Sequence, residues 1–184
     1  EALYVLGYSP GGHVALRYAH EAPVQRVRGV AAVCAPLDLD LSARHIDASS
    51  SYVYRRHVLD GLNEIYAAVS RRRSVPTSVE RVRRAVSLRT WDSMTVVPRF
   101  GFDDVAHYYG RMSDGPQLDR LRVPSLLVQS TVDPMVPPWT YERHLARPLP
   151  RLSVRRIPAG GHVAFPHVPD GRGGAGSLET QILE

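Results

Sequence analysis

The sequence predicts an α/β fold, in which a mostly parallel sheet is interrupted by a helical insertion, and three observations support this class. Short apolar runs typical of buried strands recur at residues 3–6, 29–35, 123–130 and 152–157. Helical patterns separate the first two runs, and a strand–helix–strand order implies a right-handed crossover. Between residues 37 and 113 helical periodicity dominates, and no strand-like run interrupts it.

The first strand and the turn after it organise the rest of the chain. The apolar run Leu3 to Leu6 leads into Gly7-Tyr8-Ser9-Pro10-Gly11, a G-x-S-x-G pattern. The stretch that follows is amphipathic and predicts one helical face made of Val14, Ala15, Tyr18 and Ala19. A strand, a sharp turn and a helix form the setting of a nucleophile elbow, where small residues two before and two after the serine leave it room. We therefore interpret Ser9 as a candidate nucleophile; the alternative is a helix N-cap serine.

Pro10 departs from the usual chemistry of such an elbow. One oxyanion donor is normally the backbone N–H of the residue after the nucleophile, and proline has none. Proline is well tolerated at the first position of a helix, although it restricts the backbone of the residue before it. The sequence therefore predicts an elbow that lacks its usual first donor.

Two later residues follow strand-like runs in the same way. Asp133 comes just after the run 123–130, at the edge where parallel sheets build their sites; the alternative is an Asp-Pro turn former. His162 follows the run 152–157 and a glycine pair; the alternative is a histidine with only a structural role. Asp38 also follows a strand-like run, but it opens the insertion and is more simply a helix N-cap. The other histidines show no paired-ligand spacing, so we expect no metal.

Ser9, Asp133 and His162 occur in the order Ser, Asp, His along the chain. This is the order of one large class of serine hydrolases. In that chemistry His162 takes the proton of the Ser9 hydroxyl as it attacks an acyl carbonyl, and later protonates the leaving alcohol. Asp133 orients His162 and stabilises its cation. The three residues therefore predict a charge relay, with Asp133 favoured over Asp38 as the acid.

The helical segment in the middle of the chain is a candidate cap. One apolar series runs through it at helical spacing: Tyr52, Val53, Val58, Leu62, Ile65, Tyr66 and Val69. An insertion of this kind between sheet strands can shape a substrate pocket and exclude water. We expect three parts: residues 1–37 with the elbow and the second strand, 38–115 as the cap, and 116–184 with the acid and histidine loops.

The chain resembles the YheT-like branch of the α/β-hydrolases, bacterial relatives of the membrane-linked ABHD lipases of animals. The likeness covers nearly the whole chain, and its most specific part is the segment from Leu88-Arg89-Thr90-Trp91-Asp92 through Gly101-Phe102 to Tyr108-Tyr109. It also includes the elbow, Ala35-Pro36-Leu37-Asp38-Leu39, Arg122-Val123-Pro124, Asp133-Pro134 and Gly160-Gly161-His162-Val163. The resemblance implies the C-terminal half of the α/β-hydrolase fold and the hydrolysis of small-molecule or lipid carboxylic esters without a cofactor. Ser9, Asp133 and His162 match the family's charge-relay positions.

Composition limits the other function classes. The formal net charge is +5, and all basic residues are arginine, which indicates a compositional bias. From Arg55 to Arg89 nine arginines face three acids, an excess of six charges. The interpretation we favour is a solvated helix surface without a nucleic-acid partner; the alternatives are nucleic acid and, as a peripheral contact, anionic lipid. The single cysteine, Cys34, lies in an apolar run, so we expect it to be a core residue. No disulfide framework is expected, a reducing compartment is permitted, and we expect the cytoplasm.

The chain opens in mid-strand, and residues 177–184 have the pattern of an interrupted helix. We expect a fragment of a longer protein, with its amino-terminal strands and second oxyanion donor elsewhere, and we expect the fragment by itself to be inactive. The rival hypothesis is a binding protein that keeps the fold but has lost efficient catalysis because of Pro10. The sequence does not indicate an oligomeric state.

Overall fold

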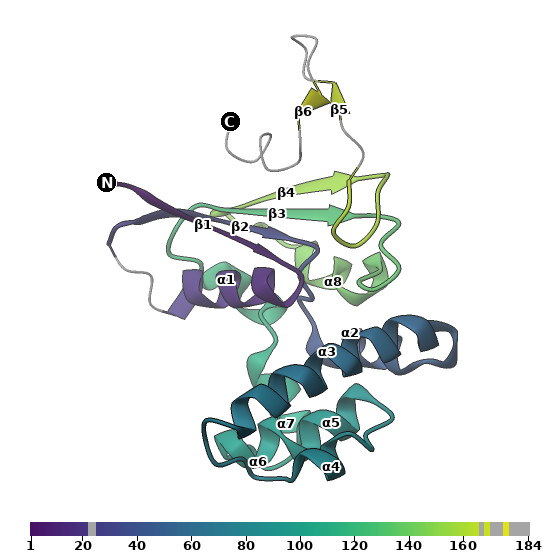
Figure 1. The fold of residues 1–184 in the computed structure, drawn as a ribbon. Coiled ribbons are helices and arrows are strands. Elements are labelled where there is room, and N and C mark those ends of the chain that lie inside the picture. Colours follow the sequence, from purple (N-terminus) through teal and green to yellow (C-terminus); the bar gives the residue numbers. More distant parts are fainter. Residues whose placement is uncertain (22–24, 166–167, 170–174, 177–184) are drawn as a thin grey trace. The chain divides into compact units, whose positions relative to one another are not determined.

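The computed structural model describes residues 1–21, 25–165, 168–169 and 175–176 of the chain (Figure 1). Four parallel strands form one sheet in the order β1-β2-β3-β4. Their bounds are β1 (Leu3–Tyr8), β2 (Val27–Val33), β3 (Ser125–Ser130) and β4 (Leu152–Ile157). A separate antiparallel pair is made of β5 (Val168–Pro169) and β6 (Ala175–Gly176). The α/β class is confirmed, and each predicted strand begins and ends within two residues of an observed one.

The remaining regular elements of the described chain are helices, joined by loops. The α-helices are α1 (Pro10–Glu21), α2 (Leu39–Asp47), α3 (Tyr52–Ser70), α4 (Val79–Val82), α5 (Leu88–Met94), α6 (Val96–Phe100), α7 (Val105–Met112) and α8 (Glu142–Leu145). The 3-10 helices are η1 (Ser49–Ser51), η2 (Gly115–Arg120) and η3 (Pro138–Thr140). Within the described residues, none of these helices combines the length and the apolar composition needed to cross a membrane. The helix predicted at 177–184 lies outside the described residues.

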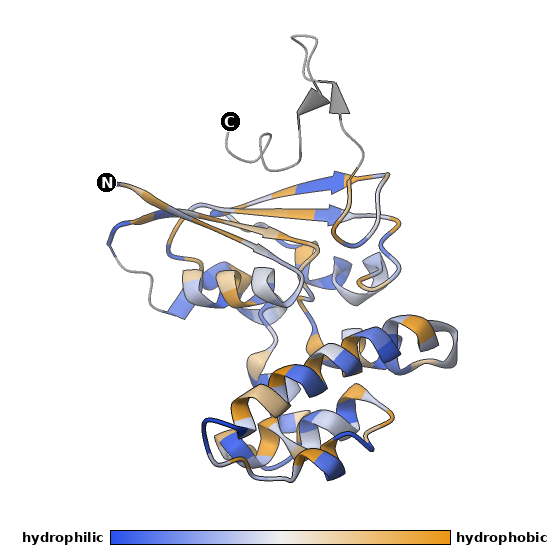
Figure 2. Ribbon diagram, viewed as in Figure 1, coloured by the Kyte–Doolittle hydropathy of each residue, from blue (hydrophilic) through white to orange (hydrophobic). Residues whose placement is uncertain are grey.

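The chain divides into two compact units, residues 1–38 with 114–184 and residues 39–113. The first unit contains the sheet, with α1 and α8 on one of its faces (Figure 1). Its core lies between the sheet and these helices, and apolar residues run along most of β2 and β3 (Figure 2). The largest fully buried apolar side chains there are Tyr141 and four leucines: Leu16, Leu37, Leu118 and Leu127. Within the described residues β1 and β4 are the edge strands of this sheet, and β1 exposes Leu3, Tyr4 and Leu6.

The buried face of α1 differs from the predicted one. Val14 is 64% exposed, so the prediction for this residue is wrong, and α1 instead buries His13, Leu16 and His20 beside Ala15 and Ala19. The reason is a buried carboxylate, Asp114, which the helical pattern could not reveal. His20 Nε2 lies 3.1 Å from Asp114 Oδ1, and His13 Nδ1 lies 3.0 Å from Oδ2. His13 directs its hydrogen bond at the Pro36 carbonyl, 3.1 Å away, so its contact with Asp114 is electrostatic.

The second unit has its own small core. Leu59 and Tyr66 of α3 pack against Val82, Ala85 and Trp91, and the Tyr66 and Trp91 rings meet edge to face. Three members of the predicted apolar series of α3 are solvent-exposed, Tyr52 by 53%, Val53 by 74% and Ile65 by 64%. Helices α2, α4 and α5 contact α3, but they leave these three side chains in water.

Asp92 is a half-buried acid of this second unit. The Tyr109 hydroxyl donates a 2.6 Å hydrogen bond to Asp92 Oδ2. Burial raises the pKa of Asp92 to about 6, and the Tyr109 hydrogen bond offsets only part of this increase. The native unit therefore favours the protonated carboxyl more than the unfolded chain does. Stability contributed by this group is complete below the ordinary pKa near 4 and is lost as the pH rises through 6.

We predict that Asp92→Asn stabilises the second unit at pH 7.5 by about 1–3 kcal/mol and has little effect at pH 4, because the amide carries no charge to desolvate. The measurement is urea unfolding followed by Trp91 fluorescence in a Trp139→Phe background. Asp60→Asn is the control, since Asp60 is an exposed acid beside Arg56 on α3. An equal gain at both pH values would contradict the prediction.

The cluster around Asp114 gives a second stability prediction. Asp114→Ala removes a fully buried carboxylate that contacts His13, Arg17 and His20, and should cost about 2–4 kcal/mol of unfolding free energy. Asp119→Ala is the matched control: Asp119 and its partner Arg147 are both about half-exposed, so the loss should stay below about 1 kcal/mol. If chemical denaturation gave equal losses of unfolding free energy for the two variants, the buried cluster would contribute no more stability than an exposed ion pair.

Candidate active site

Ser9 occupies the sharp turn between β1 and α1. Its φ angle is 51°, in the left-handed region that side-chain-bearing residues rarely adopt. The Ser9 N–H donates to the Val33 carbonyl at 2.8 Å, and the Ser9 carbonyl accepts from the His13 N–H at 3.2 Å. The strained turn is therefore fixed on one side by β2 and on the other by the first turn of α1.

Glycine is required at position 7 for a steric reason. A Cβ built on Gly7 would lie 2.2 Å from the Gly11 carbonyl oxygen and 2.7 Å from the Gly12 nitrogen. A Cβ on Gly11 would meet nothing, whereas one on Gly12 would lie 3.0 Å from the Gly7 carbonyl and 3.1 Å from the Ala35 Cβ. The sequence predicted that the elbow requires glycine at positions 7 and 11. In the structure the positions where a side chain would collide are 7 and 12.

Asp133 lies in the turn after β3, and its side chain is fully buried. Its Oδ1 accepts the backbone N–H groups of Met135 and Val136 at 2.8 and 3.1 Å. Burial by itself would raise the pKa of Asp133, but the hydrogen bonds from His162 and from these two amides outweigh it and hold the pKa below its ordinary value. Asp133 is therefore ionised at neutral pH, and its second oxygen is available to a histidine.

His162 lies in the loop after β4 and connects the other two residues. Gly160 has a φ of 92°, and the Gly161 N–H donates to the Ala164 carbonyl, which closes a short turn around the histidine. His162 Nδ1 is 2.7 Å from Asp133 Oδ2, and Nε2 is 2.6 Å from Ser9 Oγ. Next to an ionised Asp133, Nδ1 carries the proton and donates it, so Nε2 accepts from the Ser9 hydroxyl. The structure thus brings the three residues predicted from the sequence together in one hydrogen-bonded chain.

Asp38, the rival acid, takes part in a different cluster. Its carboxylate contacts the Arg143 guanidinium, and His144 Nε2 lies 3.3 Å from the same oxygen. Burial lowers the pKa of His144, and the hydrogen bond to Asp38 opposes that effect. Asp38 therefore links the segment after β2 to α8. The hydrogen bond of His162 Nδ1 is made with Asp133 and not with Asp38.

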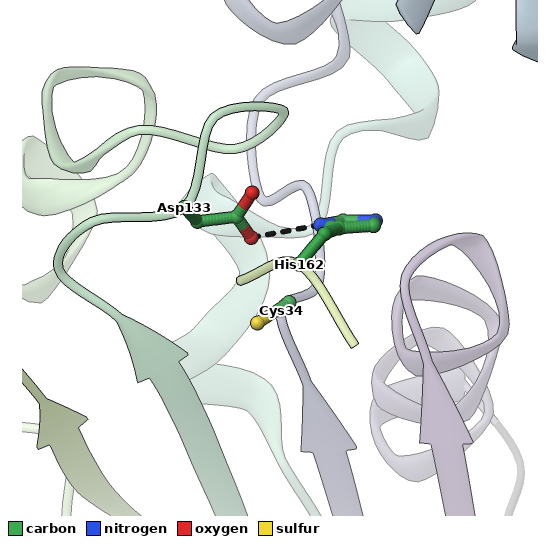
Figure 3. A group of neighbouring side chains, drawn as sticks. All are labelled: Cys34, Asp133 and His162. Carbon is green, nitrogen blue, oxygen red and sulfur yellow. Dashed lines mark hydrogen bonds and ion pairs between the residues drawn. The ribbon is translucent and has the colours of Figure 1, made fainter. Parts of the chain in front are cut away.

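Cys34 is a residue next to the site that the sequence analysis assigned only to the core. It is fully buried, follows β2 directly and has a φ of 49°. A ligand atom from each of Cys34, Asp133 and His162 lies within 4.8 Å of the other two, and Figure 3 shows the three residues together. Burial, with a smaller effect of the Asp133 charge, raises the pKa of the Cys34 thiol to about 12, so the thiol is protonated. Its place at a strand exit, like those of Asp133 and His162, was the signal in the sequence.

The amino end of α1 lies directly after the nucleophile position. Pro10 is the first residue of α1 and carries no N–H, and the His13 N–H is used by the Ser9 carbonyl. The first helical amide after Ser9 is therefore that of Gly11. Helix N-termini carry partial positive charge, which favours an oxyanion near these amides.

Two proteins named as esterases are similar in sequence to this chain. Putative esterase YheT of Escherichia coli strain K12 is 26% identical over 163 residues, which is 87% of this chain and 48% of that protein. Medium-chain fatty acid ethyl ester synthase/esterase 2 of Saccharomyces cerevisiae is 30% identical over 90 residues, 49% of this chain and 20% of that enzyme. The chain thus spans about half the length of YheT and less of the yeast enzyme. These matches confirm the resemblance to YheT-like proteins.

A solved structure supports the fold. The alpha/beta fold family hydrolase from Bacillus anthracis strain Sterne aligns with a TM-score of 0.51 at 17% identity, covering 88% of this chain and 61% of that one. A protein family described as "alpha/beta hydrolase fold" matches residues 1–167. With an elbow serine, a buried aspartate and a loop histidine at the same edge of a parallel sheet, the chain belongs to the α/β-hydrolase fold family.

Proposed function

We propose that this chain carries the active site of a serine hydrolase that acts on carboxylic esters, with Ser9 as nucleophile, His162 as general base and Asp133 as orienting acid. The observation that carries the proposal is the pair of short hydrogen bonds at His162, 2.6 Å to Ser9 Oγ and 2.7 Å to Asp133 Oδ2. Nucleophile, base and orienting group in such a chain are the signature of activated-serine catalysis.

The proposed reaction proceeds in two steps. His162 Nε2 takes the proton of Ser9 Oγ as this oxygen attacks the ester carbonyl, and the imidazolium then protonates the leaving alcohol to give an acyl-serine. In the second step His162 takes a proton from water, which attacks the acyl group; the imidazolium then returns this proton to Ser9 Oγ as the acyl–oxygen bond breaks and the carboxylic acid leaves. Asp133 is ionised, buried and bound by two backbone amides, so it orients Nδ1–H and stabilises the imidazolium in both steps. The reaction needs no cofactor.

The substrate is proposed from chemistry and from the relatives' names. Both reported relatives carry the word esterase, and the yeast enzyme is named for medium-chain fatty acid ethyl esters. We propose a small-molecule or lipid ester as substrate and the cytoplasm as location. A peripheral contact with a membrane and the absence of a nucleic-acid partner remain predictions from the arginine pattern.

A catalytically weakened binding protein is the second candidate function, and Pro10 is the observation that favours it. A serine-directed fluorophosphonate probe distinguishes the two functions, because covalent labelling requires an activated hydroxyl. Labelling of Ser9 that is lost in His162→Ala supports the hydrolase, whereas a protein that never labels supports the binding function.

We predict that, in the intact full-length protein, Ser9→Ala and His162→Ala each remove nearly all ester turnover, and that the double variant loses little more, because members of a relay act as a unit. Asp133→Asn should lower the rate on the order of ten-thousand-fold by favouring the wrong tautomer of His162. The measurement is turnover of a short-chain aryl ester. Additive losses, or a loss of this size in Asp38→Asn with Asp133→Asn nearly normal, would contradict the assignment.

A second prediction addresses Pro10. A missing oxyanion donor costs ~3–4 kcal/mol of transition-state stabilisation, a factor of roughly a hundred to a thousand in rate. Pro10→Leu restores an N–H next to Ser9, and should raise the turnover number by at least about tenfold with little change in substrate binding. Active serines are counted by probe titration in both proteins, so that a folding difference is not mistaken for a rate difference.

The opposite outcome has a defined meaning. If the Gly11 amide already acts as the donor, Pro10→Leu leaves the turnover number unchanged or lowers it. That result would refute the prediction that Pro10 slows catalysis. It would indicate that the Gly11 amide is the hydrogen-bond donor that stabilises the oxyanion.

A further inference from the structure

Two residues of the proposed relay and one neighbouring cysteine bring three different metal-binding groups together. Cys34 offers a sulfur, Asp133 a carboxylate oxygen and His162 a ring nitrogen, all within 4.8 Å of one another (Figure 3). The residues come from three separate loops, after β2, β3 and β4, which is why their spacing in the sequence did not indicate a site. Thiolate, imidazole and carboxylate are the ligands that zinc-like cations prefer in proteins.

We propose that Cys34, Asp133 and His162 form an inhibitory site for a thiophilic divalent cation such as Zn²⁺, and that metal bound there switches ester hydrolysis off. The inhibition rests on the proposed function, whereas the binding site itself does not. The cation has three protein ligands, and water takes the fourth position of a tetrahedron.

The distances require only a small adjustment. With Zn–N near 2.0 Å and Zn–S near 2.3 Å, neighbouring ligand atoms of a tetrahedral site lie about 3.5 Å apart. The 2.7 Å separation between Asp133 Oδ2 and His162 Nδ1 must widen to that value, and any separation as long as 4.8 Å must shrink to it, through movements of roughly 1 Å. The histidine belongs to a loop with two adjacent glycines, Gly160 and Gly161, so its backbone can accommodate the change. His162 is the partly exposed member of the three, and the cation enters from its side.

Metal binding changes which nitrogen of His162 carries a proton. The cation takes the lone pair of Nδ1, and the proton that Nδ1 donated to Asp133 moves through solvent to Nε2. The Cys34 thiol releases its proton to solvent, because the charge of the cation stabilises the thiolate. The bonds Zn–S, Zn–N and Zn–O form, the hydrogen bond between Asp133 and His162 breaks, and one proton is released per metal. With Nε2 protonated, His162 can no longer take the proton of Ser9, so the base is disabled.

The first experiment measures binding without any need for turnover. Co²⁺ replaces Zn²⁺ as an optical probe, since a cobalt–thiolate bond gives a charge-transfer absorption in the near ultraviolet. Cys34 is the sole cysteine of the 184 residues, so Cys34→Ala should abolish this band. Competition by Zn²⁺ should remove the band from the unaltered protein. Absence of the band, or its survival in Cys34→Ala, would overturn the site.

The second experiment measures inhibition. Zn²⁺ should reduce both ester turnover and fluorophosphonate labelling of Ser9, and a chelator should restore them. Cys34→Ala and the near-isosteric Cys34→Ser should raise the zinc concentration for half-inhibition by at least about tenfold, each relative to its own uninhibited rate. Two variants are used so that poor folding of one leaves the test intact.

A surface pair provides the matched control. His107 and Asp103 of the second unit form an exposed pair, with His107 Nδ1 2.9 Å from Asp103 Oδ2, where zinc could bind adventitiously. His107→Ala should leave zinc inhibition unchanged; inhibition that follows His107 and not Cys34 refutes the proposal. If ester turnover is present but insensitive to zinc, the proposed hydrolase activity stands and the inhibitory role of the metal is refuted. If the cobalt–thiolate band appears in a protein without ester turnover, the metal site stands and the proposed hydrolase activity is refuted.

Discussion

The approach of the β1 backbone to the first turn of α1 is the constraint on which the site depends. A side chain at Gly7 would start 2.2 Å from the Gly11 carbonyl oxygen, so strand and helix can meet only because this side chain is missing. The chain must then reverse within two residues, which forces Ser9 to a φ of 51°. Such strain costs of order 1–3 kcal/mol and persists only when the surroundings over-determine the turn. Here β2 and α1 supply that support, through hydrogen bonds at both ends of Ser9 and the packing of Leu16.

The parallel register brings the remaining residues to the same place. Tyr8 pairs with Val33, Val33 with Val128, and Ser130 with Ile157, so the four strands end along one edge of the sheet. Loops that leave parallel strands at their carboxyl ends necessarily share that edge. Ser9 and His162, 153 residues apart in sequence, thereby come within hydrogen-bond distance. The sheet therefore replaces the entropy cost of assembling three distant side chains with the cost of forming its own backbone pairing.

The sequence predicted those features that depend on local pattern. Apolar runs identified the four strands of the sheet, and a strand exit marked Ser9, Asp133 and His162 before any contact was known. Contacts between distant segments were not predictable. Periodicity placed Val14 on the buried face of α1, because nothing near it in sequence reveals that Asp114, a hundred residues later, attracts His13 and His20. Asp38 and Asp133 looked alike as acids after strands, and only the partners of each carboxylate separate them.

The identity of residue 34 follows from how Asp133 divides its hydrogen bonds. Two backbone amides occupy Oδ1, which leaves Oδ2 to His162, and the Cys34 thiol lies beside the same carboxylate. A thiol is a weak donor, so it competes little with the imidazole for this oxygen. A hydroxyl at the same position would donate more strongly, draw charge away from His162 and weaken the orientation of Nδ1. Cysteine therefore fills the space beside the acid at little electrostatic cost, while leaving a soft ligand atom within 4.8 Å of a ligand atom of His162.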